Sequence, residues 1–250
     1  MSSNVSLTIY NLKLWTTPLN LLFVFFTVFF SLLANASIVI WPTNLVIENS
    51  AKTTILHLEN RDHQPIVLQA RVYQWKQVNG EEQLVQQQNI VASPPIMTIE
   101  ANSQQIVRII NKQKPLVNEE LTYRLIVDEI PTKDKNQQGV SFQMRYSLPI
   151  FVYGENLQHD SVIDNMQKFL SWRWIENGNK KWLELNNQGI THVHLSSIDL
   201  QQKMSNQLSS YVLPHSVIRI AINNKQIKKP QKITAVINGT KSTTIINNEF

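Results

Sequence analysis

The chain has no cysteine among its 250 residues. Catalytic thiols, disulfide bonds and thiolate metal sites are therefore excluded. Charged side chains make up only 16% of the residues, and Lys and Arg form no long run apart from the cluster Lys225–Lys232. That cluster is typical of a solvated loop or of an edge strand protected by lysines, and we expect no nucleic acid as a partner.

The motifs of common enzyme classes are also missing. No Gly-x-Ser-x-Gly elbow, phosphate-binding glycine loop or His-Glu-x-x-His helix is present. Carboxylates occur as adjacent pairs such as Asp128-Glu129, which point to opposite faces of a strand and form no acid/base couple. We expect a protein that is not an enzyme, with no cofactor, no bound metal and no small-molecule substrate.

Long apolar runs are confined to the first 36 residues. Leu21–Leu33 is an apolar run of about 13 residues that follows Lys13 and ends before Ala34-Asn35-Ala36. This is the layout of a secretory signal, whereas a membrane-spanning helix needs about 20 apolar residues. We expect residues 1–36 to be a cleaved signal peptide and the exported chain to begin at Ser37.

After the leader, short apolar-polar alternations follow one another with the two-residue period of β-strands. A first group of predicted strands covers 37–40, 44–48, 53–59, 67–75, 96–99, 105–110, 121–130 and 140–152. A second group covers 169–175, 181–186, 192–198, 207–212, 217–223 and 234–237. With Tyr153–Asn156 as a hinge, the spacing predicts two antiparallel sandwiches, over residues 37–153 and 154–250.

The longest predicted strand is Val140–Val152, at roughly twice the usual strand length. Its large apolar residues alternate with mostly polar ones, and they are Val140, Phe142, Met144, Tyr146, Leu148, Ile150 and Val152. A strand of this length can extend beyond its own sheet. The surplus is an apolar edge, which is an aggregation hazard unless it serves to pair with another chain.

Two arginines lie in or next to this strand. Arg145 is within it, and Arg124 is in the preceding strand of a predicted hairpin closed by the loop 132–139. Guanidinium groups on neighbouring strands near a hinge can clamp a carboxylate with charge-assisted hydrogen bonds. The alternative is that each arginine makes an ordinary surface ion pair.

Aromatic and histidine side chains suggest two further sites. Trp172, Trp174 and Trp182 are candidates for a carbohydrate-stacking surface, although alternating aromatics are more often core or cross-strand pairs. His192 and His194 share a predicted strand face as metal ligands would, but no third ligand is near in the sequence. A half-exposed strand face is the simpler interpretation.

Five segments, in this order, resemble signatures of the periplasmic pilus-assembly chaperones, the PapD-like family. They are Ser93-Pro94-Pro95-Ile96, the Gln-x-x-Arg strand at 103–109, the strand 123–131 that ends in Glu-Ile-Pro, the Asn-rich turn and strand at 185–193, and the Leu-Pro loop at 211–216. The resemblance covers the chain after residue 36. It implies an all-β protein with two immunoglobulin-like β-sandwich domains in a boomerang arrangement.

The resemblance also implies a function and partners. Members of this family bind pilin subunits, which lack a final strand, in the periplasm and deliver them to an outer-membrane usher. The donor strand supplies alternate apolar side chains to the subunit, and here they would be Val140, Phe142, Met144, Tyr146 and Leu148. A secreted sandwich protein that binds carbohydrate or adheres to surfaces is the alternative.

One departure concerns the carboxylate of the subunit. Familiar members anchor it with an Arg in the first strand and a Lys in the last, and the matching positions here are Asn44 and Ser147. This departure indicates the archaic branch of the family. We expect Arg124 and Arg145 to be the replacement pair, with Arg108 as a further candidate.

Overall fold

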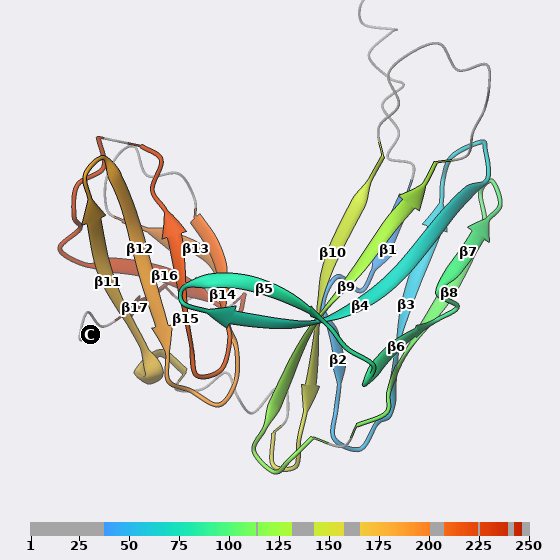
Figure 1. Ribbon diagram of the computed structural model, residues 1–250, viewed down its shortest axis with the longest axis horizontal. Coiled ribbons are helices and arrows are strands. Elements are labelled where there is room, and N and C mark those ends of the chain that lie inside the picture. The colour runs from blue at the N-terminus through green and yellow to red at the C-terminus, as the bar shows by residue number, and fades with distance from the viewer. Residues whose placement is uncertain are drawn as a thin grey trace, which may run out of the picture. The chain divides into compact units, whose positions relative to one another are not determined.

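The computed structural model describes residues 38–113, 115–131, 143–157, 166–200, 208–224, 226–239 and 243–246. The expected signal peptide, residues 1–36, lies outside these ranges. The described elements are β-strands apart from the single 3-10 turn η1 (Met166–Phe169), as Figure 1 shows. No helix in these ranges has the length and apolar character needed to cross a membrane. The all-β prediction is confirmed.

The first sandwich consists of two sheets. One has the order β1 (Ile38–Trp41), β3 (Thr53–Asn60), β8 (Gln104–Asn111), β6 (Ile90–Ser93). The other has the order β2 (Leu45–Ile47), β10 (Arg145–Tyr153), β9 (Glu120–Ile130), β4 (Ile66–Val78), β5 (Glu81–Gln86), and β7 (Ile96–Ile99) also pairs with β4. The pairs are antiparallel except that β2 runs parallel to β10.

Side-chain alternation decides which face of the β2–β5 sheet is buried. Leu125 and Val127 of β9 and Ile150 of β10 point into the core and are fully buried, and such burial stabilises by about 1.5–3 kcal/mol per side chain. The residues between them point the other way. We call that second side of the sheet the outer face.

The second sandwich pairs a three-stranded sheet with a four-stranded one. The first has the order β11 (Leu170–Asn177), β12 (Lys180–Asn187), β15 (Ser216–Ala221), and the second has the order β14 (Leu208–Val212), β13 (Val193–Asp199), β16 (Ile233–Ile237), β17 (Thr243–Ile246). A separate apolar core fills this sandwich, with Trp172, Leu183 and Leu195 among its members. The predicted two-sandwich architecture is therefore present.

A third apolar cluster joins the two sandwiches. Its members come from both, and they are Trp75, Phe151, Tyr153, Leu157 and Leu213, with Val46 and Tyr211 packed against them. The Gln77 amide adds two hydrogen bonds, since it donates to the Tyr211 carbonyl at 2.8 Å and accepts from the Leu213 N–H at 3.0 Å. Residues 38–250 form one compact unit.

Three strands have no counterpart in the sequence prediction, namely β5, β6 and β17. β5 was missed because all six of its residues are exposed, so it lacks the alternation that marks a half-buried strand. β10 begins at Arg145, five residues later than Val140. It ends at Tyr153, and the domain limits at 153 and 154 stay a prediction.

Candidate partner-binding site

The strand β10 has one edge that is largely unpaired. From Arg145 to Tyr153 it pairs with β9, but on its other side β2 covers only Ile150–Val152. Figure 1 shows the short β2 beside one end of β10. Among the described residues, no strand pairs with that edge from Arg145 to Pro149. Its backbone groups are therefore available to another chain.

The side chains along β10 change from exposed to buried. Met144, just before the strand, is 45% exposed, Tyr146 is half-buried, and Leu148 is 8% exposed in the chain's own core. Burial raises the pKa of the Tyr146 hydroxyl. Val140 and Phe142 lie outside the described residues. Among the described donor positions, exposure to solvent therefore decreases from Met144 to Leu148.

The two predicted anchor arginines share the outer face but lie apart. Arg145 is paired with Asp128 in the β9–β10 register, whereas Arg124 is paired with Pro149. The four positions between the two register pairs correspond to about 13 Å along the sheet. The structure thus places both on one surface, each with its own set of contacts.

Arg145 and Arg71 both bind the carboxylate of Asp128. Arg145 Nε lies 2.5 Å from Asp128 Oδ1, and an Nη atom of Arg71 bonds to Oδ2. The Asp128 side chain is 14% exposed, against 68% for Arg145 and 41% for Arg71. Burial alone would raise the pKa of Asp128, but the hydrogen bonds from Arg145 and Arg71 outweigh it and hold this pKa below its usual value.

Arg124 has a different environment, over the ring of Trp75 and near that of Tyr211. Its guanidinium carbon lies 3.6 Å from the Trp75 ring centroid and 5.5 Å from that of Tyr211. Only 14% of the side chain is exposed, and Glu82 is 3.9 Å away. Burial lowers the pKa of Arg124, while the charge of Glu82 opposes that change. Arg124 therefore also holds the sandwiches together.

The remaining candidates for the carboxylate anchor lie elsewhere. Arg108 is in β8, which belongs to the other sheet, and there it is paired with Ile55 and Ser93. It therefore does not share a sheet face with the other two arginines. Ser147 is exposed on β10, and Asn44 is exposed just before β2. These uncharged positions add no cation to the outer face.

The two histidines do not form a metal site. His192 is 7% exposed, so the expected half-exposed face is wrong for it. Its backbone N–H donates to the Glu120 carboxylate at 3.1 Å, and its Nδ1 lies 2.9 Å from Oε1. His194 stacks on Tyr211 with 4.2 Å between ring centroids. The described residues contain no group of three or more His, Cys, Asp or Glu side chains suited to a metal.

The three tryptophans do not share a surface. Trp172 is 2% exposed in the core of the second sandwich, where its Nε1 donates to the Ile246 carbonyl. In the β11–β12 register Trp174 is paired with Leu183 and Trp182 with Ile175, so Trp182 points to the opposite face of the sheet. The proposed carbohydrate-stacking surface is therefore wrong.

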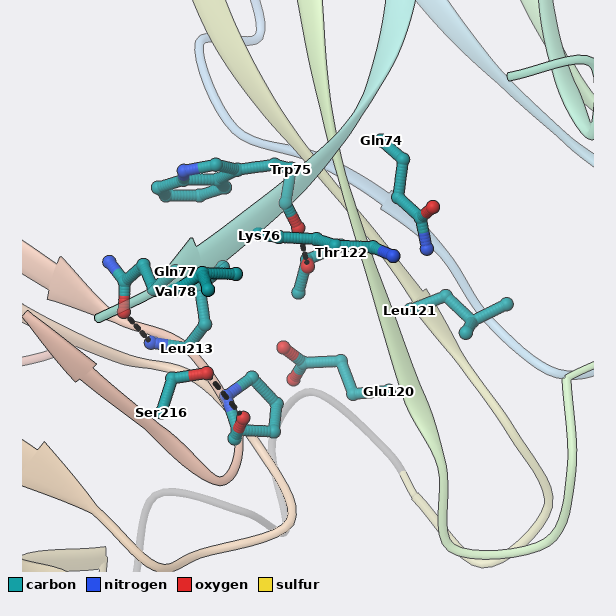
Figure 2. Close-up of a pocket in the computed structure, with 11 residues that line it drawn as sticks. Gln74, Trp75, Lys76, Gln77, Val78, Glu120, Leu121, Thr122, Leu213 and Ser216 are labelled. Carbon is teal, nitrogen blue, oxygen red and sulfur yellow. Dashed lines mark hydrogen bonds between the residues drawn. The ribbon is translucent and has the colours of Figure 1, made fainter. Parts of the chain in front are cut away.

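A pocket of about 240 Å³ lies where β4 and β9 meet the loop after β14. It is lined by Gln74, Trp75, Lys76, Gln77, Val78, Glu120, Leu121, Thr122, Leu213, Pro214 and Ser216. Figure 2 shows that Gln77, Thr122 and Ser216 each hydrogen-bond to another part of the wall. Because its walls come from both sandwiches and these groups are already paired, we describe the pocket as part of the junction between the sandwiches.

Sequence reasoning missed Arg71 and the role of Asp128. Arg71 alternates with Tyr73 and Trp75 along β4, which places it on the outer face with Arg124. That alternation was a usable signal. The pairing of Asp128 with both arginines depends on the β4–β9–β10 register, which the sequence alone does not provide.

Comparisons with known proteins find relatives of this chain. Residues 37–158 match the family model described as "Pili and flagellar-assembly chaperone, PapD N-terminal domain". The uncharacterised fimbrial chaperone YhcA of Escherichia coli K12 is 26% identical over 184 residues, covering 72% of this chain and 76% of the relative.

Solved structures are similar over both sandwiches. A chain in the CsuC–CsuE chaperone–tip adhesion subunit pre-assembly complex, from the archaic chaperone-usher Csu pili of Acinetobacter baumannii, is 30% identical with a TM-score of 0.69. The match covers 84% of this chain and 97% of that one. A chain in the complex of SafA pilin with the SafB chaperone from Salmonella enterica has a TM-score of 0.57 at 17% identity. The match covers 87% of this chain and 95% of that one, and it shows the fold alone.

Proposed function

Because the chain belongs to the PapD-like family of pili and flagellar-assembly chaperones, we propose that it is a periplasmic chaperone for pilus subunits. It acts by donor-strand complementation: the segment from Val140 to Leu148 completes the fold of a subunit that lacks a strand. The chaperone then delivers the subunit to an outer-membrane usher. The family is one of chaperones, and we assign the chain no catalytic step.

The unpaired edge of β10 is the observation that supports this proposal most. An incoming strand can add its main-chain hydrogen bonds along the edge of Arg145–Pro149 that faces away from β9, where no described strand pairs with it. Of the predicted donor positions that the structure describes, Met144 and Tyr146 are the ones that are not fully buried. Leu148 already belongs to the core of the chaperone, so it supports the strand from within while Val140, Phe142 and Met144 insert into the subunit.

The carboxylate anchor is the second part of the proposal. Arg145 is 68% exposed beside the open edge, and Arg124 lies further along the same face. Together they supply the positive charge that Asn44 and Ser147 lack. Guanidinium groups bind carboxylates through parallel N–H donors, so a carboxylate of the subunit binds on the outer face.

The last part of the proposal concerns the export of the chain, its domain limits and its branch of the family. We assign residues 1–36 as the signal peptide that directs the chain to the periplasm, and residues 37–153 and 154–250 as its two domains. The match to a chain from archaic chaperone-usher pili, together with Asn44 and Ser147, favours the archaic branch. No observation favours carbohydrate binding, since Trp172 and Trp182 point to different faces.

The donor segment is tested by subunit capture. Phe142→Ser combined with Met144→Ser should reduce the affinity for a co-expressed pilin subunit by about 100-fold or more, because each inserted side chain contributes about 1.5–3 kcal/mol. Leu84→Ser, which replaces a 48% exposed residue on the opposite edge of the same sheet, is the matched control and should leave capture unchanged. Unchanged affinity of the double variant would show that another strand is used.

The anchor is tested in the same assay. Arg145→Ala and Arg124→Ala should each abolish capture while the chaperone stays folded, as judged by circular dichroism. Arg145→Ala is the cleaner variant, since Arg124 also stacks on Trp75 and Tyr211. Full capture by both variants would remove these residues from the anchor, and the donor-strand proposal would stand without them.

A further inference from the structure

Asp128 divides its carboxylate between two guanidinium groups. One oxygen accepts from Arg145 Nε and the other from Arg71, so neither arginine is bound through two parallel N–H groups. A two-pronged contact between one guanidinium and one carboxylate is the stronger arrangement. Each arginine therefore makes a weaker contact with Asp128 than a two-pronged one would be.

Arg71 shows the incomplete pairing directly. Its Nε atom is buried and has no hydrogen-bond partner among the described residues, so Asp128 satisfies only one side of its guanidinium. Its guanidinium carbon also lies 5.9 Å from the Tyr73 ring, which holds the side chain against the sheet. Asp128 is consequently shared and has no exclusive partner.

The position of this cluster matters for partner binding. Arg145 is the first residue of β10, beside the edge that no described strand covers. A strand that pairs with this edge brings its own polar groups next to Arg145. Ion pairs of exposed arginines are weak, so the bond between Arg145 and Asp128 is one that a partner group can replace.

We propose that Asp128 is an internal competitor for the partner's carboxylate. In the free chaperone its carboxylate neutralises Arg145, and on capture a carboxylate of the subunit takes Arg145 while Asp128 keeps Arg71. This inference rests on the proposed function and adds a regulating residue to its anchor. The affinity for the subunit is then lower than the arginines alone would give, which favours later release.

The experiment measures capture of a co-expressed pilin subunit by the full-length chain carrying Asp128→Asn. The variant should bind about 3- to 10-fold more tightly, since it no longer has the competing ion pair, and the gain should shrink as salt is raised. Glu81→Gln, an equal change of charge on the exposed strand β5, is the matched control and should bind as the wild type does. Asp128→Ser is a second variant in case Asn perturbs the fold.

A double variant identifies the arginine involved. With Arg145→Ala in place, Asp128→Asn should not restore capture, because the gain depends on freeing Arg145 and the two residues act as a pair. A subunit extended by two residues at its C-terminus shows which carboxylate is bound. If Asp128→Asn no longer strengthens capture of this subunit, the C-terminal carboxylate is the ligand. If Asp128→Asn still strengthens capture, the ligand is an acidic side chain. Both results support the inference.

Two results would overturn the proposal in different ways. If the wild type captures the subunit but Asp128→Asn and Asp128→Ser capture it equally well or more weakly, Asp128 positions the arginine and does not compete. If the wild-type chain captures no subunit at all, the proposed function fails, and this inference fails with it.

Discussion

Single residues decide how closely the chain segments of the junction approach one another. Gly154 follows β10, and its N–H donates to the Glu119 carbonyl at 2.8 Å. A Cβ at this position would lie 1.9 Å from the carbonyl oxygen of Leu116. The requirement for glycine here comes from close packing against the backbone, because only hydrogen fits between the two segments.

We therefore expect Gly154→Ala to lower the free energy of unfolding by about 1–3 kcal/mol, the usual cost of overpacking. Urea titration of the purified chain measures it. Gly178→Asn is the control, because nothing lies within 4 Å of an added Cβ there and its φ of 58° is one that Asn tolerates. Equal stability of the two variants would contradict this account of Gly154.

At the scale of elements, the β4–β5 hairpin reaches from the first sandwich to the second. Its turn at Gly80 pairs with β15: the Arg219 N–H donates to the Gly80 carbonyl at 2.8 Å. The Arg219 side chain crosses Gly80 and ends at Glu184, with Nε 2.6 Å from Oε2. These contacts attach the turn of the hairpin to β15, in addition to the two hydrogen bonds of Gln77 in β4.

Gly80→Ala should weaken this attachment. The new Cβ would lie 2.7 Å from Arg219 Cγ, and φ at residue 80 is +85°, so both contact and backbone are strained. We expect a loss of about 1–3 kcal/mol in urea unfolding and faster hydrogen exchange of the Arg219 N–H. In an Arg219→Ala background the loss should be smaller, because the clash is absent; an equal loss would mean that backbone strain alone is responsible.

At the scale of the whole molecule, a partly buried histidine next to the junction between the sandwiches links stability to pH. Burial lowers the pKa of His194, and the nearby His192 and Arg124 lower it further. The folded state therefore favours the neutral ring, and its contribution to stability is complete above the unfolded pKa, about 6.5. As the pH falls through the lower folded value, that contribution is lost.

The melting temperature should accordingly fall between about pH 7.5 and pH 5.5. His194→Gln should make this fall smaller, since the variant has no ring to protonate. The control is His63→Gln, which replaces an exposed histidine and should leave the slope unchanged. Identical slopes for wild type and His194→Gln would assign the acid sensitivity to other groups.

Strand positions were readable from the sequence where one face is buried. The alternation in β9 and in β12 marks core residues such as Leu125 and Leu185, because a two-residue period assigns each side chain to a face. β5 was not readable, since all its residues are exposed. The candidate site could be predicted only in part: the sequence singled out Arg145 as a candidate, but it did not predict the pairing of Arg145 with Asp128.

The amino-acid sequence by itself determined the all-β character, the two-sandwich organisation and the resemblance to pilus chaperones, because periodicity and turn residues are local properties of the chain. Only the tertiary structure decided that Arg124 contacts Trp75 and Tyr211, that His192 meets Glu120, and that Asp128 joins Arg71 to Arg145. These contacts join residues that are 17 to 87 positions apart, as the numbering shows. Their partners are fixed by strand register and by packing between sandwiches, which no local pattern encodes.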